Sequence, residues 1–226
     1  MFSIALDGPA GAGKSTVAKL IASELGMHYV DTGAMYRTLA YGLLKSGVDI
    51  RDEAAVAEAL PGFVTDIRYE DGCQKMFLNG EEVTPFIRTA EVGEGASVTS
   101  SYGCVRNKLL QMQRGLALRY DVVMDGRDIG TVILPDAPLK VYLTADDTER
   151  GRRRFLELEA KEPGRYTLEE VVEQIRDRDY RDMHRAIAPL TRAKDAVLVD
   201  TTAITAKEAA AMVAAVARER GAGRGL

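Results

Sequence analysis

Nine residues near the N-terminus have the types and spacing needed to bind the phosphates of a nucleotide. Residues 8–16, here called the phosphate loop, match G-x-x-x-x-G-K-[ST] at every fixed position and are Gly8, Pro9, Ala10, Gly11, Ala12, Gly13, Lys14, Ser15 and Thr16. Glycines let the backbone turn around phosphate oxygens, and a helix that begins there presents the positive end of its dipole to the same anion. Lys14 offers a charge to the β and γ phosphates, Ser15 a hydroxyl to Mg²⁺, and Thr16 a hydroxyl and an N–H to the α phosphate. The segment therefore predicts a site for a nucleotide with Mg²⁺.

A second group of polar residues follows a short apolar run at 122–124. Asp125, Arg127 and Asp128 stand where an open α/β sheet places its ligand contacts, at the carboxyl end of a strand. Two carboxylates and a guanidinium could contact Mg²⁺-bound water, a phosphate and a base edge at once. We expect these residues to face the phosphate loop, with Asp125 reaching Mg²⁺ through water, although an ordinary Asp-Gly turn with a surface ion pair is the alternative.

Residues 31–37 follow another apolar run in the same way. Asp31 and Thr32 precede a helical pattern that contains Tyr36 and Arg37. The N-terminus of such a helix could bind an anion, with Arg37 one turn into the helix. Without the phosphate loop nearby, the same residues would indicate only helix capping.

Two clusters of arginines lie in the C-terminal half of the chain. Their members are Arg150, Arg153 and Arg154 in the first, and Arg178, Arg181 and Arg185 in the second, which are spaced to share one helical face beside Asp182. Alone, they could be solvated ion pairs with the acidic residues around them. Phosphoryl transfer between two nucleotides, however, spreads negative charge over a transition state that several converging arginines would stabilise.

The elements that must position these residues alternate between strand and helix. Buried strands are expected at residues 2–6, 29–30, 122–124, 139–143 and 196–199, each followed by a helical pattern. This order predicts one five-stranded parallel sheet in an α/β protein. Residues 61–88 break the rhythm with alternating apolar residues and the turn signals Asp71-Gly72 and Asn79-Gly80, so we expect a small antiparallel meander there.

The expected fold class is a three-layer P-loop NTPase fold with that sheet, an inserted small lobe, and a short helical lid. We predict one domain over 1–226, with its core at about 1–60, 89–150 and 167–220. The insertion covers about 61–88, with adjoining helices at 91–100 and 104–119. The lid covers about 151–166, where Pro163-Gly164 interrupts two helices and a capping box at Thr167 begins the second. Residues 221–226 are expected to be a frayed end.

Composition excludes several classes of protein. The chain has 226 residues and a net charge of −4, from 30 basic and 34 acidic residues, so no nucleic-acid partner is expected. Two cysteines without a CxxC pair argue against disulfides and structural zinc and favour a reducing cytoplasm. No apolar run approaches the roughly 20 residues of a membrane span, and no coiled-coil heptad is seen, so we expect a monomer without membrane contact.

Other nucleotide-binding proteins are less consistent with the sequence. Asn107-Lys108 is followed by Leu109-Leu110 and does not match the N-K-x-D segment of switch GTPases. Motors and helicases usually need longer chains and a strand that ends in Asp-Glu. Another small-molecule P-loop kinase acting on uridylate, adenylate or shikimate, and a slow nucleotide-dependent switch, remain as alternatives.

Over essentially its whole length, the chain resembles the bacterial cytidylate kinases, a branch of the nucleoside monophosphate kinases. The matching segments are GPAGAGKST at 8–16, DTGAMYR at 31–37, IRT at 87–89, DGRDIGT at 125–131 and RDYRDMHRAIAPL at 178–190. The resemblance implies Mg²⁺-dependent transfer of the γ-phosphoryl of ATP to CMP or dCMP, giving ADP and CDP or dCDP. The long insertion also resembles the enlarged lobe of this family, which implies that it binds the monophosphate.

The resemblance also implies roles for individual residues. The cytosine edge would be read by Ser97, Arg106 and Asp128, which suit its amino donor and its N3 and O2 acceptors. The monophosphate would be held by Arg37, Arg127 and Arg185, and the ribose approached by Arg178 and Asp182, with Asp31, Thr32, Tyr36 and Asp125 completing the substrate site. The transferring phosphoryl would be stabilised by Lys14, Arg127, Arg185 and the closing arginines Arg154 and Arg181, with Arg153 as a further candidate.

Overall fold

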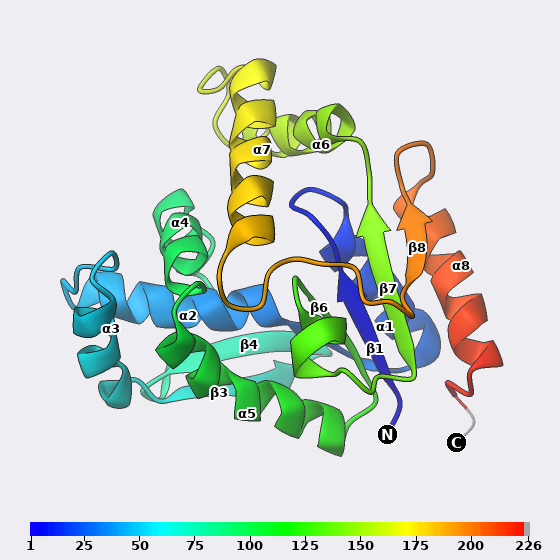
Figure 1. Cartoon of the computed structure of the whole chain (residues 1–226), viewed down its shortest axis with the longest axis horizontal. Coiled ribbons are helices and arrows are strands. Elements are labelled where there is room, and N and C mark those ends of the chain that lie inside the picture. Colours follow the sequence, from blue (N-terminus) through cyan, green and yellow to red (C-terminus); the bar gives the residue numbers. More distant parts are fainter. Residues whose placement is uncertain (224–226) are drawn as a thin grey trace.

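A five-stranded parallel sheet forms the centre of the computed structural model, which describes residues 1–223 (Figure 1). Its strand order is β2-β6-β1-β7-β8. The strands are β1 (Ser3–Asp7), β2 (His28–Asp31), β6 (Val122–Gly126), β7 (Leu139–Thr144) and β8 (Val197–Asp200). All five predicted strands and their parallel pairing are confirmed.

Helices cover both faces of this sheet and bury the apolar side chains of β1 on alternate sides. Ile4 and Leu6 pack into a core with α1 (Lys14–Leu25) and α8 (Ala206–Glu219). Ala5 points the other way, into a core with Leu116 of α5 (Gly103–Arg119) and the π-helical turn Ile129–Ile133. The alternation follows from the two-residue period of a strand and gives the predicted three layers.

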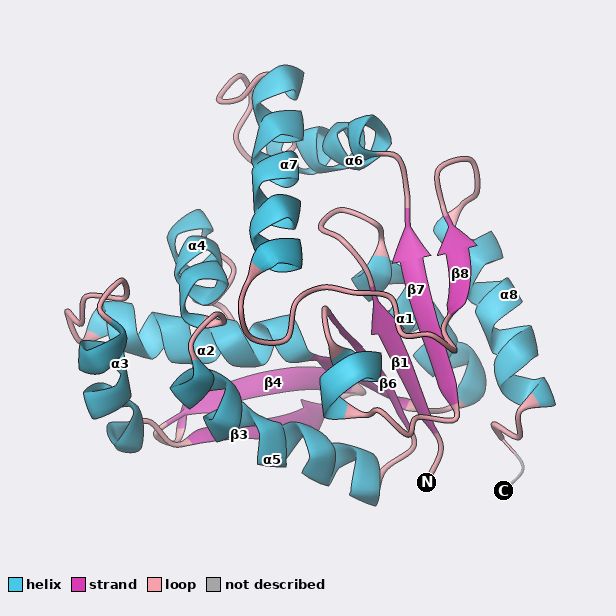
Figure 2. Ribbon diagram, in the orientation of Figure 1, coloured by secondary structure: helices cyan, strands magenta, loops and turns pink. Residues whose placement is uncertain are grey.

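The insertion contains the expected antiparallel sheet of β3 (Thr65–Glu70), β4 (Cys73–Leu78) and β5 (Glu81–Glu82) (Figure 2). Asp71 and Gly72 have φ values of 50° and 72°, and Asn79 and Gly80 have 51° and 87°. Positive φ at both central residues is the conformation of a tight hairpin turn, so both turn signals are confirmed.

The insertion shares its core with α2 (Thr32–Lys45), the helix that follows β2. Leu39 and Leu43 of α2 pack with Met76 and Leu78 of β4. The side-chain amide of Gln74 also bonds the backbone N–H of Asp31 at 2.8 Å and its carbonyl at 3.2 Å. These contacts fix the small sheet against the end of β2.

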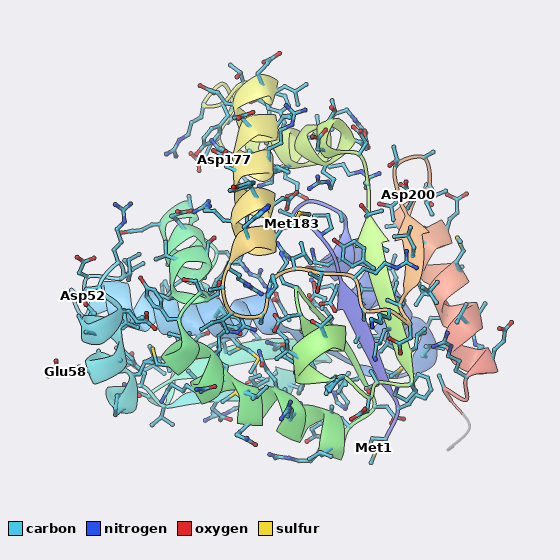
Figure 3. The ribbon with its side chains drawn as sticks, in the orientation of Figure 1. Met1, Asp52, Glu58, Asp177, Met183 and Asp200 are labelled. Carbon is cyan, nitrogen blue, oxygen red and sulfur yellow. The ribbon has the colours of Figure 1, made fainter. Side chains whose placement is uncertain are left out.

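Two further helices flank the insertion. They are α3 (Glu53–Ala59), extended by the 3₁₀ turn Leu60–Gly62, and α4 (Ala90–Thr99). The helix patterns predicted at 91–100 and 104–119 correspond to α4 and α5, whereas α3 was not predicted. Asp52, which caps α3, and Glu58 lie at the outer edge of the molecule (Figure 3).

A hairpin of α6 (Asp147–Glu159) and α7 (Leu168–His184) stands over the carboxyl ends of the strands (Figure 1). The predicted capping box of Thr167 and Glu170 is confirmed. The prediction that Arg185 shares a helical face with Arg178 and Arg181 is wrong, because α7 ends at His184 and Arg185 is extended (φ −64°, ψ 143°). The chain turns back there: Ala188, directly before Pro189, has a left-handed φ of 50°, and the N–H of Leu190 bonds the Asp182 carbonyl at 2.8 Å.

The C-terminal segment is more ordered than its composition indicates. Ala222 is buried in the core shared by α1 and α8, and its N–H bonds the Ala217 carbonyl at 2.9 Å. The prediction of a frayed end is therefore wrong for residues 221–223, and its remainder, 224–226, lies outside the described residues. None of the helices in the described part of the chain is long and apolar enough to cross a membrane.

Candidate active site

The phosphate loop joins the carboxyl end of β1 to the first turn of α1. Gly11 and Gly13 have φ values of 73° and 84°, a left-handed conformation that favours glycine. No side chain caps the N-terminus of α1, since the N-cap residue is Gly13 itself. The first N–H groups of α1 therefore remain available to an anion.

Lys14 is buried at the start of α1, with 7% of its surface exposed. Its Nζ donates to the carbonyl of Pro9 at 2.6 Å, so the side chain folds back along the loop. Burial holds the pKa of Lys14 well below its usual value, and the nearby charge of Arg127 lowers it further. A bound anion would relieve both effects.

Asp125 joins the phosphate loop to the end of β6. Its carboxylate accepts hydrogen bonds from Ser15 Oγ at 2.8 Å and from the Tyr29 hydroxyl at 3.1 Å. Burial raises the pKa of Asp125 to about 6, and the neighbouring carboxylate of Asp31 adds to the rise. Thr32, predicted to bind substrate, donates its hydroxyl to the Asp125 carbonyl at 2.7 Å and so fixes the strand end.

The Ser15 hydroxyl and the Asp125 carboxylate are a donor set that fits Mg²⁺, which prefers oxygen ligands. In the described residues no group of three or more His, Cys, Asp or Glu side chains could hold a metal ion by itself. Mg²⁺ itself usually keeps several waters and takes its other ligands from substrate phosphates, so it requires few ligands from the protein.

Three residues form a cluster that we call the base cluster: Asp128, which follows Asp125 by three residues, together with Arg106 and Arg185. Asp128 is 3% exposed and pairs with Arg106 of α5 through one carboxylate oxygen, while Arg185 donates to the other at 3.2 Å. The guanidinium of Arg106 also lies 5.8 Å from the centre of the Tyr36 ring. Thus the structure brings Tyr36, Arg106, Asp128 and Arg185 together, as expected for a substrate site.

Ser97 stands apart from these bonded contacts. It lies on α4, and its carbonyl accepts a hydrogen bond from Ser100 Oγ at 2.9 Å. Arg106 donates to the Ser100 carbonyl at 3.1 Å, which ties the end of α4 to the base cluster. Within residues 1–223 the Ser97 hydroxyl itself makes no hydrogen bond, so its role in base reading stays a prediction.

A second group, the arginine cluster, comprises Arg37, Arg127 and Arg178 together with Asp182. Arg127 Nε donates to Asp182 at 2.7 Å, and the Nε of Arg178 is buried without a hydrogen-bond partner among residues 1–223. Burial lowers the pKa of Arg178 to about 10, and the charge of Arg127 lowers it further. Burial likewise lowers the pKa of Arg37. Three cations around one carboxylate leave an excess of positive charge, which suits an anionic ligand.

Arg88 is a residue of this site to which the sequence analysis assigned no role. It follows the small sheet of the insertion and pairs with Asp31, whose carboxylate also accepts the N–H of Ala34 at 2.8 Å to cap α2. The charge of Arg88 contributes to the lowered pKa of Arg37. The segment IRT at 87–89 was a signal that could have drawn attention to it.

Two candidate lid arginines form ion pairs with surface carboxylates, which a bound phosphate could replace. Arg154 pairs with Glu157, and Arg181 with Glu94 of α4, with the two arginine side chains 48% and 49% exposed. The charge of Arg154 still lowers the pKa of Arg37, so it lies within electrostatic reach of the arginine cluster. Arg153 instead donates to the Thr201 carbonyl at 2.6 Å and to Glu149.

Asp7 is a buried carboxylate of this region that the sequence analysis missed. It accepts the N–H groups of Ile129 at 2.8 Å and Gly130 at 2.7 Å and thereby holds the backbone directly after Asp128. Burial raises the pKa of Asp7 to about 6 although these hydrogen bonds lower it. The position of Asp7, directly after a buried strand and before the phosphate loop, was the available signal.

The raised pKa of Asp7 predicts a pH-dependent effect of Asp7→Asn. The folded protein binds this proton more tightly than the unfolded chain, so the contribution of Asp7 to stability is present at low pH and is lost as pH rises through about 6. Asparagine does not titrate. The free energy of unfolding of the variant relative to the parent should therefore rise by about 1 to 3 kcal/mol between pH 4 and 7. Urea unfolding at both pH values checks this, and a constant difference would contradict it.

Comparisons with known proteins agree on one family. A family model described as cytidylate kinase matches residues 4–219. A cytidylate kinase of Lactobacillus johnsonii is 43% identical over 220 residues, covering 97% of this chain and 95% of the relative. Those of Leuconostoc mesenteroides and Pseudomonas aeruginosa are each 47% identical, over 94% and 88% of this chain and 95% and 87% of the relative.

A comparison of folds finds the same architecture in a solved structure of distant sequence. A crystal structure of an uncharacterized protein from Eubacterium ventriosum matches with a TM-score of 0.51 at 12% identity. The match covers 96% of this chain and 99% of that one. It supports the fold of the chain over its whole length.

Proposed function

The chain belongs to the cytidylate kinase family, and we propose that it binds ATP at the phosphate loop and CMP or dCMP between the base and arginine clusters. The enzyme transfers the γ-phosphoryl of ATP to CMP, giving CDP and ADP. The observation that carries the residue assignment is the pairing of a buried carboxylate, Asp128, with Arg106 directly beside an excess of arginines.

The base cluster supplies groups that match cytosine. The 4-amino group of cytosine donates and would meet the carboxylate of Asp128, while N3 and O2 accept and would meet a guanidinium such as that of Arg106. Uracil carries an acceptor at position 4, which a carboxylate repels. This polarity favours CMP over UMP.

The arginine cluster supplies the charge that the monophosphate needs. Arg37 and Arg127 would contact its oxygens, and Asp182 and Arg178 would lie against the ribose, as the family resemblance implies. Arg185, assigned to the monophosphate by the same resemblance, is bonded here to Asp128 through Nη2 and to the Ala188 carbonyl through Nε, so a phosphate would meet its remaining N–H groups.

Catalysis in this arrangement rests on positioning and electrostatics. The phosphate oxygen of CMP is already an anion, so the in-line attack requires no covalent enzyme intermediate. Lys14 would leave the Pro9 carbonyl for the β and γ phosphates, and Arg154 and Arg181 would exchange their surface carboxylates for the transferring group. Closure of these arginines would exclude water and suppress hydrolysis of ATP.

Ser15 and Asp125 would hold Mg²⁺, with Asp125 acting through water, and the ion would neutralise charge on the β and γ phosphates. We also propose a monomer, because the sequence contains no coiled-coil heptad, and no nucleic-acid partner, because the chain carries a net charge of −4. The two cysteines, Cys73 and Cys104, are free, which supports a reducing cytoplasm as its location.

A coupled assay of ADP formation from Mg-ATP tests the proposal. We expect activity with CMP and dCMP far above activity with UMP, AMP, GMP and shikimate, and little ADP without an acceptor. If UMP or AMP were preferred, Ser97, Arg106 and Asp128 would not read cytosine. Acceptor-independent hydrolysis would instead favour a nucleotide-dependent switch.

A further inference from the structure

Two side chains from the α6–α7 hairpin hold the tip of the phosphate loop. The N–H of Ala10 donates to Asp179 Oδ1 at 2.9 Å, and the carbonyl of Ala10 accepts from Arg150 Nη1 at 2.8 Å. Arg150 and Asp179 also pair with each other, at 7% and 6% exposure. Both polar groups of one loop residue are therefore bound from outside the loop by a buried ion pair.

Close packing fixes this pair in place. Next to Arg150, Gly151 of α6 lies so near Val172 of α7 that a Cβ at position 151 would overlap that side chain. Arg150 Nε also donates to the Ala145 carbonyl at 2.9 Å. On the loop side, a Cβ at Gly11 would lie 3.1 Å from the Cβ of Arg150. The loop tip and α6 are thus in direct contact.

The planarity of the peptide group relates these contacts to phosphate binding. In a trans peptide, the carbonyl oxygen of one residue and the N–H of the next point in opposite directions. Because the Ala10 carbonyl is directed at Arg150, the N–H of Gly11 must point to the opposite side. Thr201 Oγ1 contributes in the same sense, since its one proton is shared between the Thr144 carbonyl at 3.1 Å and the Ala12 carbonyl at 3.3 Å, and the second contact helps to orient the N–H of Gly13.

We propose that Arg150 and Asp179 are positioning residues that orient the N–H groups of the phosphate loop toward ATP before it binds. The inference rests on the proposed binding of ATP phosphates by residues 8–16. The inference gives Arg150 a role different from that of the exposed Arg154, although the sequence analysis placed both in one arginine cluster. A loop held in its binding conformation loses less freedom when ATP arrives, which increases affinity.

The test compares Asp179→Ala with the parent by calorimetric titration of the full chain with ATP, inorganic tripolyphosphate and CMP. Affinity for ATP and tripolyphosphate should fall by about 5- to 30-fold, the effect of losing one or two hydrogen bonds and the order they impose, while affinity for CMP changes by less than about threefold. Asp179→Asn keeps an oxygen for the Ala10 N–H and should recover most of the loss.

Arg176→Ala provides a matched control. Arg176 of α7 pairs with Asp147 of α6 at 2.7 Å, at the protein surface, so the variant removes another ion pair of the same hairpin without touching the loop. Its affinity for tripolyphosphate should equal that of the parent. An equal loss in Arg176→Ala and Asp179→Ala would overturn the proposal, because general loosening of the hairpin would explain both.

A second pair of variants covers the case in which Asp179→Ala does not fold. Thr201→Val removes the hydroxyl that contacts the Ala12 carbonyl, and Thr201→Ser restores it. Weaker tripolyphosphate binding in the valine variant with recovery in the serine variant would support positioning of the loop from outside. Parent-like tripolyphosphate binding in both Thr201→Val and Arg150→Gln, which removes the guanidinium bonded to the Ala10 carbonyl, would overturn the proposal.

Lys14→Ala separates failure of this inference from failure of the proposed function. If Lys14→Ala weakens tripolyphosphate binding and a folded Asp179→Ala does not, only the positioning role is wrong. If neither substitution changes that binding, the assignment of residues 8–16 to the phosphates of ATP is wrong as well.

Discussion

Lys14→Ala should lower kcat for CMP phosphorylation by at least about 100-fold, the effect expected when a preorganised charge is removed from a transition state. Lys14 is buried in the phosphate loop, and the charge of Arg127 helps to lower its pKa. Removal of a buried charge that is repelled by its neighbour should not destabilise the fold. We therefore expect lost activity with an unchanged or higher melting temperature.

Lys19→Ala is the control for this variant. Lys19 lies on the same helix but is exposed, with its Nζ 5.6 Å from the centre of the Tyr29 ring. Its turnover should remain close to that of the parent in the coupled assay. Near-normal turnover of a folded Lys14→Ala would remove Lys14 from the mechanism.

Asp128→Asn should reduce the preference for CMP over UMP, measured as the ratio of kcat/KM values, by about 10- to 100-fold. The asparagine amide can donate to the uracil oxygen at position 4, whereas the carboxylate repels it. Asparagine is preferable to alanine here because alanine would leave Arg106 and Arg185 without their carboxylate, at a cost of about 3 to 5 kcal/mol.

Asp136→Asn is the matched control for the selectivity experiment. Asp136 is exposed and lies a few residues beyond the π-helical turn that follows Asp128. The same loss of charge there should leave the CMP to UMP ratio unchanged. An unchanged ratio in Asp128→Asn would exclude Asp128 from base recognition.

The parts of the molecule that sequence reasoning predicted are those encoded by local patterns. The five buried strands, the hairpin turn at Asp71-Gly72 and the capping box at Thr167 each depend on residues close together in the chain. Their side-chain spacing or backbone conformation is sufficient to identify them. The phosphate loop is predictable for the same reason.

The parts that escaped prediction depend on contacts between distant residues. Asp7 meets Ile129 across 122 positions, and Ala10 meets Asp179 across 169, with no periodic signal to relate them. Arg150 belonged to a cluster that surface ion pairs could have explained, and only the fold reveals that it is buried. Similarly, Arg185 left the expected helical face because the chain turns before Pro189.

The proposed site has one half that binds ATP and one half that binds CMP, and the two halves consist of different kinds of groups. The ATP half consists largely of backbone N–H groups at the start of α1, whereas the CMP half consists of side chains that converge from α2, α5, the end of β6 and α7. Met183 lies near the end of α7 that approaches the sheet (Figure 3). Side-chain substitutions in the CMP half should therefore change the recognition of CMP more than the binding of ATP.

A crystal structure with CMP and a non-hydrolysable ATP analogue tests the central claim most directly. The account predicts triphosphate oxygens on the N–H groups of residues 11–16 and the cytosine amino group within about 3.2 Å of the Asp128 carboxylate. The CMP phosphate should contact Arg37 and Arg127. A cytosine that faces away from Asp128, or a triphosphate bound outside the phosphate loop, would contradict the account.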